Sequence, residues 1–178
     1  MEIRRESYGG RWYEIYIQDW GQDCGPTCVA MARKLLTGVG SDIDWLRKSE
    51  KRPLVSPGIQ ARIEALGMES RDFGSYSGDL VDLARSVGLR AKFYDLSSLA
   101  LVDTLKTASR ERAFIIHVEW SGGGHFVVVR HVNSAGSAIV LDPYYGLQVT
   151  STAPIYSFSS GGGHIHGRFS GDAVEVTR

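Results

Sequence analysis

Two cysteines and five histidines are the side chains of this 178-residue chain best suited to nucleophilic or metal chemistry. Cys24 is the most informative, because Pro26 suits the first turn of a helix and Gly38 suits the position just after its last turn. A thiol at a helix start meets unpaired backbone N–H groups and the positive end of the helix dipole, which favour the thiolate. Cys24 is therefore a candidate nucleophile, and the alternative is an ordinary small core residue.

A nucleophilic cysteine needs a base, a group that orients the base, and donors for the oxyanion on the attacked carbonyl. His125 is the best candidate base, because it opens the apolar run HFVVVRHV directly after a glycine turn. Asp142 ends the run AIVLD and is the candidate for orienting His125, with a simple turn-forming aspartate as the alternative. Gln18 is the candidate oxyanion donor, together with the Cys24 N–H. Gln22 competes for this role, and an exposed loop glutamine is the alternative for Gln18.

The other cysteine and the other histidines carry weaker signals. Cys28 lies one helical turn beyond the first cysteine and is assigned to the core, since a disulfide across one turn is geometrically poor. His117 and His131 lie inside apolar runs and are expected to be ordinary strand histidines. His164 and His166 form an H-x-H pair, and a metal-binding or structural role for them stays open as an alternative. No motif implies a metal or an organic cofactor.

The composition suits one well-buried domain and limits the partners. Acids and bases number 20 each and no long basic run occurs, so neither nucleic acid nor an anionic membrane is an expected partner. No window is long and apolar enough to span a bilayer, and the N-terminus lacks the apolar segment of a signal peptide. Two cysteines exclude a disulfide framework and fit a reducing compartment. We therefore expect a soluble protein.

The spacing of apolar residues predicts where the helices and strands lie. The expected elements of the first half are a strand at 11–17, helices at 24–37, 41–50, 56–67, 79–88 and 97–111, and a strand at 89–96. From residue 113 onward, β-branched runs separated by glycine or asparagine turns predict an antiparallel sheet. Helices first and strands second, without regular βαβ alternation, predict an α+β domain with the cysteine helix packed on the sheet.

The order and local context of these candidate residues resemble a known family. Gln18, the segment DCGPT at 23–27 opening a helix, Gly-Gly-His125 before an apolar strand, and Asp142 before proline are similar to the motifs of papain-like cysteine peptidases. Within that superfamily the chain looks most like the bacteriocin-processing peptidases, the double-glycine leader peptidases usually fused to ABC exporters. The resemblance covers residues 12–150.

This resemblance implies a papain-like fold and a cysteine endopeptidase that cuts protein or peptide substrates after small residues, often Gly-Gly. It implies Cys24 as nucleophile, His125 as general base and acid, Asp142 as the residue orienting His125, and Gln18 as oxyanion-hole donor. Two alternatives stay open. A papain-like glutamine deamidase or transglutaminase would use the same residues, and an inactive papain-like binding module would use none of them for chemistry.

Three features depart from the exporter-bound members of that family. The stretch at 40–78 is longer than expected, no membrane-spanning or nucleotide-binding segment follows, and residues 151–178 extend past the usual domain end. We therefore expect residues 1–178 to form a single domain with a motif-bearing core at about 12–150 and a C-terminal extension at about 151–178. Freestanding domains with similar motifs occur as secreted bacterial effectors and interbacterial toxins. That likeness implies a place in the bacterial cytoplasm or delivery into a target cell, with an inhibitor or immunity protein as a partner.

Overall fold

The computed structural model describes residues 2–19, 23–43, 45–46, 75–120, 123–152, 156–160 and 163–178. The helix expected at 56–67 and the competing residue Gln22 lie outside the described residues. Of the helix expected at 41–50, Ile43, Trp45 and Leu46 are helical, whereas Ser41 and Asp42 are not, and the remaining residues lie outside the described part.

The described helices and strands follow the expected order, with three additions, one strand at the N-terminus and two strands after residue 155. In chain order they are β1 (Glu2–Tyr8), β2 (Arg11–Ile17), α1 (Cys24–Thr37), α4 (Ser77–Ser86), β3 (Arg90–Asp95), α5 (Ser98–Leu105), β4 (Arg112–Trp120), β5 (Gly123–Val132), β6 (Ser137–Asp142), β7 (Gly146–Ser151), β8 (Tyr156–Ser160) and β9 (Gly163–Thr177). The sequence pattern did not predict β1, whose side chains are mostly polar and exposed. It is a strand because Gly9 and Gly10 both have positive φ, which suits the tight turn of a hairpin with β2.

The large sheet contains seven described strands in the order β3-β9-β4-β5-β6-β7, with β8 paired to β9. All of the pairs are antiparallel. β9 therefore lies inside the sheet, between β3 and β4. Val174 and Val176, which lie on β9 in the stretch expected to be a C-terminal extension, are fully buried in the main core. A strand from the chain end completes the sheet, and no local pattern indicates such a distant partner.

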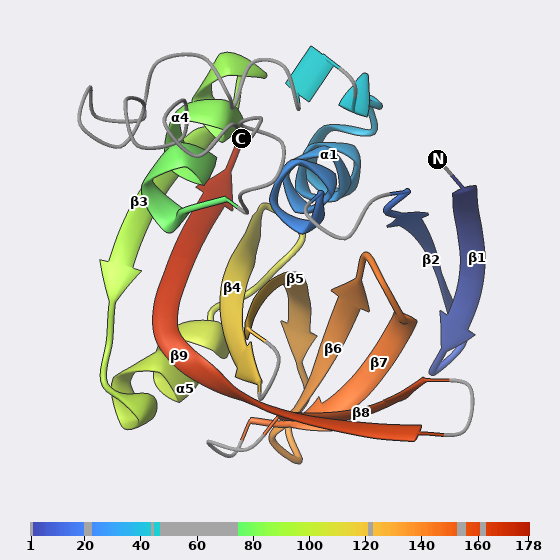
Figure 1. Ribbon diagram of the computed structural model, residues 1–178, viewed down its shortest axis with the longest axis vertical. Coiled ribbons are helices and arrows are strands. Elements are labelled where there is room, and N and C mark those ends of the chain that lie inside the picture. The colour runs from blue at the N-terminus through green and yellow to red at the C-terminus, as the bar shows by residue number, and fades with distance from the viewer. Residues whose placement is uncertain are drawn as a thin grey trace, which may run out of the picture.

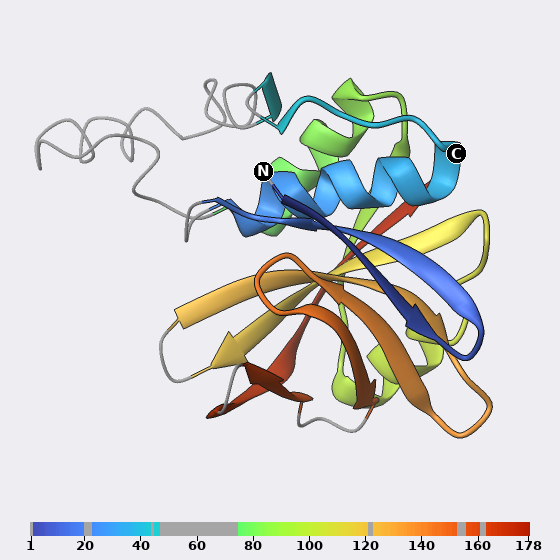
Figure 2. The same cartoon turned by 90° about the vertical axis from the view of Figure 1, so that its right-hand side faces the viewer.

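Helices cover both faces of the large sheet, as Figure 1 and Figure 2 show. The main core contains Ile115 and Val128 from the sheet and much of α1 and α4. On the opposite face, Phe114 and Val127 pack with Leu105 of α5 in a second core. Neighbouring residues of each strand point to opposite faces, so these strands are buried on both sides. The structure confirms the α+β fold with the cysteine helix packed on an antiparallel sheet.

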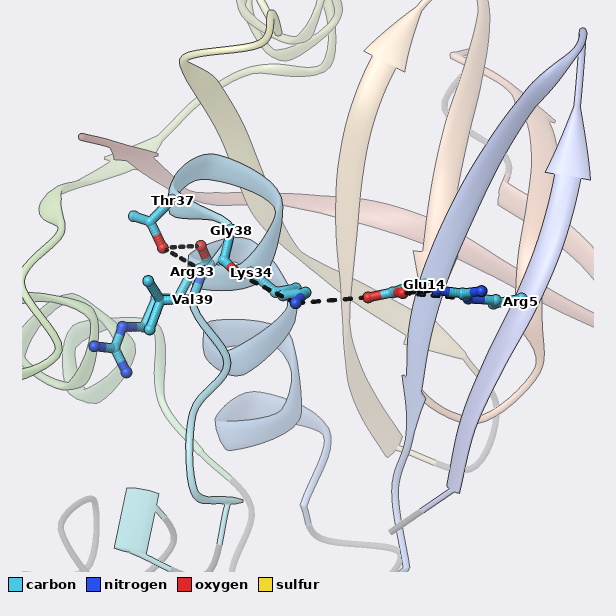
Figure 3. A network of polar contacts seen from close by, with 7 residues as sticks. All are labelled: Arg5, Glu14, Arg33, Lys34, Thr37, Gly38 and Val39. Carbon is cyan, nitrogen blue, oxygen red and sulfur yellow. Dashed lines mark hydrogen bonds and ion pairs between the residues drawn. The ribbon is translucent and has the colours of Figure 1, made fainter.

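The C-terminal end of α1 is closed by a glycine cap and tied to the β1–β2 hairpin. Gly38 has a φ of 76°, and its N–H donates to the Lys34 carbonyl at 2.9 Å. The Lys34 Nζ lies 3.8 Å from Glu14 Oε2, and the other carboxylate oxygen of Glu14 accepts from Arg5 at 2.8 Å. Figure 3 shows these polar contacts running from the end of α1 to the hairpin. These ion pairs link the C-terminal end of α1 to the hairpin strand β2. The N-terminal end of α1 is connected instead to the loop that follows β2.

Candidate active site

Cys24 is the first residue of α1, as its sequence context predicts. The carbonyl of Asp23 accepts the first helical hydrogen bond, from the Thr27 N–H at 3.0 Å, so the thiol sits in the turn whose N–H groups lack helical partners. The residue is buried, with an exposed fraction of 5%. Only a small part of Cys24 is therefore accessible to a substrate from solvent.

Gly25 fits a close contact between α1 and the segment that leads into α4. A Cβ at Gly25 would lie 2.0 Å from Ser75 Oγ and 2.8 Å from Leu80 Cδ2. The glycine is thus required for space and not for an unusual backbone conformation. Sequence reasoning used this glycine only as part of the DCGPT motif, because the neighbour that crowds it lies 50 positions further along the chain.

His125 contacts both of the groups that the sequence assigns to it. It lies on β5 opposite Val118 of β4 and is buried. Its Nε2 is 2.9 Å from Asp142 Oδ1, and a further hydrogen bond joins the ring to Cys24. Because Asp142 engages Nε2, Nδ1 is the ring nitrogen left for Cys24. The structure therefore brings Cys24, His125 and Asp142 together in one chain of contacts.

The charge state of His125 follows from these contacts. Burial lowers the pKa of the ring, but the hydrogen bonds to Asp142 and Cys24 and the charges of the same two groups outweigh it. The result is a pKa of about 9 in place of the ordinary 6.5. His125 therefore carries a positive charge at neutral pH, beside the side chain of Cys24.

Asp142 both forms the turn after β6 and holds the ring of His125. Its Oδ1 accepts the backbone N–H of Tyr144 at 2.7 Å and of Tyr145 at 3.1 Å, in addition to the contact with His125. The residue has no exposed surface. Asp142 therefore forms the turn and contacts the His125 ring at the same time, because its Oδ1 makes both kinds of contact.

Gln18 lies in the loop between β2 and α1 and is tied to the Asp142 turn. Its backbone N–H donates to the Pro143 carbonyl at 2.8 Å, and its side-chain Oε1 is buried. Gln18 is therefore not an exposed loop glutamine. On the other side of the turn, Glu6 Oε2 accepts the Leu147 N–H at 3.2 Å. The unexpected strand β1 thus helps to fix the turn that carries Asp142.

Cys28 is a core residue, in line with its assignment from the sequence. It has no exposed surface, and its Sγ donates to the Phe126 carbonyl at 3.2 Å. Burial is the main cause that raises its pKa well above the ordinary thiol value, and the charges of Cys24 and Asp142 add to the effect. The neutral thiol is a poor nucleophile.

Two other histidines on the sheet lie outside this chain of contacts. His117 is half-buried, its Nδ1 is 3.0 Å from Ser170 Oγ, and burial is the main cause that lowers its pKa. A Cβ at Gly124 would lie 2.2 Å from His117 Nε2, so the glycine before His125 makes room for a neighbouring ring. Sequence reasoning interpreted that glycine run only as a flexible turn. His131 is exposed near the far end of β5.

Among the described residues, no three or more His, Cys, Asp or Glu side chains lie together so that they could hold a metal ion. The side chains of His164 and His166 lie outside the described part of the structure. Among the described helices, none has the length and apolar character needed to cross a membrane.

Comparison with solved structures connects this architecture to peptidase domains. The peptidase domain of Streptococcus ComA, a bi-functional ABC transporter involved in a quorum-sensing pathway, matches with a TM-score of 0.64 at 20% identity, over 93% of this chain and 98% of that one. The fold is that of a papain-like peptidase domain. A double glycine motif protease from an AMS/PCAT transporter, solved with its leader peptide, matches with a TM-score of 0.52 at 22% identity, over 92% of this chain and 91% of that one.

The peptidase domain of Streptococcus mutans ComA has the same fold, with a TM-score of 0.54 at 18% identity over 93% of this chain and 100% of that domain. No family model and no curated protein matches the sequence. The papain-like fold is thus shared over almost the whole chain although few residues are identical.

Proposed function

We propose that this chain is a cysteine endopeptidase that cleaves protein or peptide substrates by acyl transfer. The observation that carries the proposal is the buried chain of contacts from Cys24 through His125 to Asp142. A cysteine that serves only to fill a core does not need a charged histidine beside it, because burying a charge costs free energy unless the charge is paired. The papain-like fold supports the same assignment.

In the proposed reaction, the Cys24 thiolate attacks the scissile carbonyl carbon while His125 is protonated. The Gln18 side-chain amide and the Cys24 N–H donate to the oxyanion of the tetrahedral intermediate. His125 then gives its proton to the leaving amine, and the C–N bond breaks to leave a thioester on Cys24. Water, deprotonated by His125, hydrolyses the thioester and restores the thiolate–imidazolium pair. Asp142 holds the ring in place through Nε2 throughout.

We propose cleavage after small residues, such as Gly-Gly. The low exposure of Cys24 supports this, because bulky side chains next to the scissile bond would meet the walls around the thiol. The shared fold with a double glycine motif protease solved with its leader peptide gives further support.

The experiment that tests the proposal is mass spectrometry of a proteome-derived peptide library incubated with the wild-type chain or with Cys24→Ala. We expect new termini after small residues with the wild-type chain and none with the variant. Absence of new termini in both samples would contradict the proposal. A library enriched in Gly-Gly sequences, compared with one in which Val-Val replaces Gly-Gly, tests the specificity separately.

Glutamine deamidation or transglutamination is the second candidate, because the same contacts would form a thioester from a side-chain amide. The chemistry is identical up to the thioester, so the contact chain supports it too. The same experiment separates the candidates. Side-chain mass shifts that depend on Cys24, without new termini, would favour this second candidate over the peptidase.

A further inference from the structure

A second feature of interest is a cavity of about 650 Å³ at the C-terminal end of α1. Leu35, in the last turns of α1, lines it, whereas Cys24 opens the helix. At 1.5 Å of rise per residue, roughly 16 Å of helix separates the two residues. Figure 2 shows the two ends of α1 on opposite sides of the molecule. The cavity is therefore distinct from the candidate active site.

The cavity is positively charged although the chain as a whole is neutral. Its lining residues come from β2, α1, the segment after α5 and β5, and they are Arg11, Trp12, Tyr13, Leu35, Ala108, Ser109, Arg110, Arg130 and His131. Three of the nine are arginines, and none is an acid. A charge concentrated in this way on a neutral chain is unfavourable unless a negative group joins it.

The acids nearest in sequence do not neutralise these arginines. Glu111 follows Arg110 directly, but no ion pair in the described part of the structure joins it to an arginine of the cavity. Glu14 lies close along β2, but its two carboxylate oxygens are engaged by Arg5 and Lys34, as Figure 3 shows. The guanidinium groups of the cavity are thus left for a negative group from outside the described chain.

Arg130 is built into the fold and is not a freely moving surface residue. In the pairing of β5 with β6, Val129 lies opposite Val140 and His131 opposite Ile139, so Arg130 is the extra residue of a β-bulge. Bulges redirect side chains and are common beside functional sites. The guanidinium donates to the Ser109 carbonyl, and the Ser109 N–H donates to the Arg112 carbonyl at 2.9 Å. Arg130 therefore holds the turn that carries Arg110.

The electrostatics of Arg130 agree with this description. Burial is the main cause that lowers the pKa of its guanidinium, Tyr13 acts in the opposite direction, and the charges of Arg11 and Arg110 lower the pKa further. No carboxylate contributes to the shift. Three like charges held close together, one of them partly buried, attract a multivalent anion more strongly than separate charges on an open surface.

The cavity also offers a flat apolar surface. Trp12 is 73% exposed, which is unusual for the largest side chain, and Tyr13 and Leu35 continue the apolar lining. Mixed cavities of this size, apolar with a few convergent polar groups, are typical of small-molecule sites. An indole face suits the stacking of a planar group.

We propose that this cavity binds a small molecule that carries two or more negative charges on phosphate or carboxylate groups and a flat apolar part that packs on Trp12. Guanidinium groups match both kinds of oxyanion, since their paired N–H groups bind two oxygens at once. Three of them require more than one negative charge for neutralisation. The site is independent of the proposed peptidase function, because it contains none of the residues assigned to that reaction.

The test is calorimetric titration of the Cys24→Ala variant, which removes any contribution from peptidase chemistry. The probes are magnesium-free adenosine triphosphate, pyrophosphate and citrate. We expect one saturable site for adenosine triphosphate, weaker binding of pyrophosphate, which has no flat part, and weaker binding of both at higher salt concentration. Binding of citrate would identify carboxylates as ligands, and its absence would restrict the site to phosphates.

Arg11→Gln and Arg110→Gln are the variants that test the site, because both side chains are exposed and the fold does not depend on them. Each should weaken adenosine triphosphate binding about ten- to a hundredfold. Trp12→Ala should reduce the advantage of adenosine triphosphate over pyrophosphate. Arg90→Gln is the matched control, since Arg90 is exposed on β3 outside the cavity, and its binding should equal that of the parent.

Three results would overturn the proposal. The first is absence of saturable binding by all three probes. The second is binding that Arg11→Gln and Arg110→Gln leave unchanged while thermal unfolding shows that both variants are folded. The third is binding of an acidic, tryptophan-containing peptide with no binding of the small anions, which would assign the cavity to a protein partner.

Discussion

The two ends of α1 handle charge in opposite ways. At the N-terminal end, His125 and Asp142 are buried and 2.9 Å apart, and Cys24 completes the contact. At the C-terminal end, the arginines of the cavity have no carboxylate partner within the described chain, and the nearby Lys34–Glu14 pair is 3.8 Å long with about a third of each side chain exposed. The charges at the N-terminal end are paired within the chain, whereas the arginines at the C-terminal end remain available to an external anion.

The difference matches the two roles that we propose for the ends of this helix. A reaction centre must fix its own charges before substrate arrives, since this avoids reorganisation during the reaction. A binding cavity must leave its charges unpaired, since the ligand provides the partner. The predictions below test this contrast between the ends of α1, in order of decreasing effect.

The largest effect on turnover is expected when the Cys24 thiol, at the N-terminal end of α1, is removed. Cys24→Ala should lower turnover by about a millionfold and leave the thermal unfolding midpoint close to that of the wild-type chain. Cys28→Ala is the matched control. It should retain activity, with a modest loss of stability from the small void it leaves. If Cys28→Ala were as inactive as Cys24→Ala, the assignment of the nucleophile would be wrong.

Gln18→Ala should lower turnover about a hundred- to thousandfold, because one of the two proposed oxyanion donors is lost. Gln18→Glu should be at least as slow, since a carboxylate repels the oxyanion. The measurement is single-turnover kinetics on a Gly-Gly peptide. The backbone N–H of Gln18 still donates to Pro143 in both variants, so circular dichroism should show an unchanged fold. Full activity of Gln18→Ala would remove this residue from the oxyanion hole.

The charged His125 at the N-terminal end predicts a pH dependence of stability. Its folded-state pKa of about 9 lies above the ordinary 6.5, so its contribution is fully present below pH 6.5 and is lost as the pH rises through 9. At 1.36 kcal/mol for each pH unit, the loss is about 3 kcal/mol. Urea unfolding at a series of pH values measures it.

Asp142→Asn provides the control for that pH series. The variant removes the negative charge that helps to raise the pKa of His125, so its stability should fall over a lower and narrower pH range. A wild-type chain whose stability is flat between pH 6.5 and 9 would contradict the charge state assigned to His125.

Close packing beside the nucleophile predicts a smaller loss of stability. Gly25→Ala places a methyl group against Ser75 and Leu80 and should destabilise the fold by about 1–3 kcal/mol. Gly78→Ala, in α4, is the matched control. A Cβ at Gly78 meets nothing within 4 Å, so that variant should be slightly more stable than the wild-type chain. Equal stabilities of the two variants, measured by urea unfolding, would contradict the close approach at Gly25.

The smallest effect is expected at the C-terminal end. Glu14→Gln removes the partner of Lys34 and Arg5 but should lower the unfolding free energy by only about 0.5 kcal/mol, because exposed pairs are well screened. A loss as large as the one expected at His125 would contradict the contrast between the two ends. Adding salt should reduce even this small loss.

The sequence predicted much of the fold because most elements depend on local signals. The proline and glycine around the cysteine helix, the glycine turn before His125 and the β-branched runs of β5 and β6 located the three residues that meet at the candidate site, Cys24, His125 and Asp142. Local signals could not predict β1, which is polar along its length and exists through pairing with β2. They also could not place β9, because its partners β3 and β4 lie far earlier in the chain.

By itself, the sequence determined the types of the candidate reacting groups and the elements that carry them: a thiol at a helix start, a histidine at a strand start, and an aspartate at a strand end. Only the tertiary structure decided that these groups meet, that burial and pairing give His125 a pKa of about 9, and that three arginines from separate elements share one cavity. The physical reason is that local propensity acts over a few residues. Distances between groups a hundred positions apart are set by the packing of the sheet and its helices.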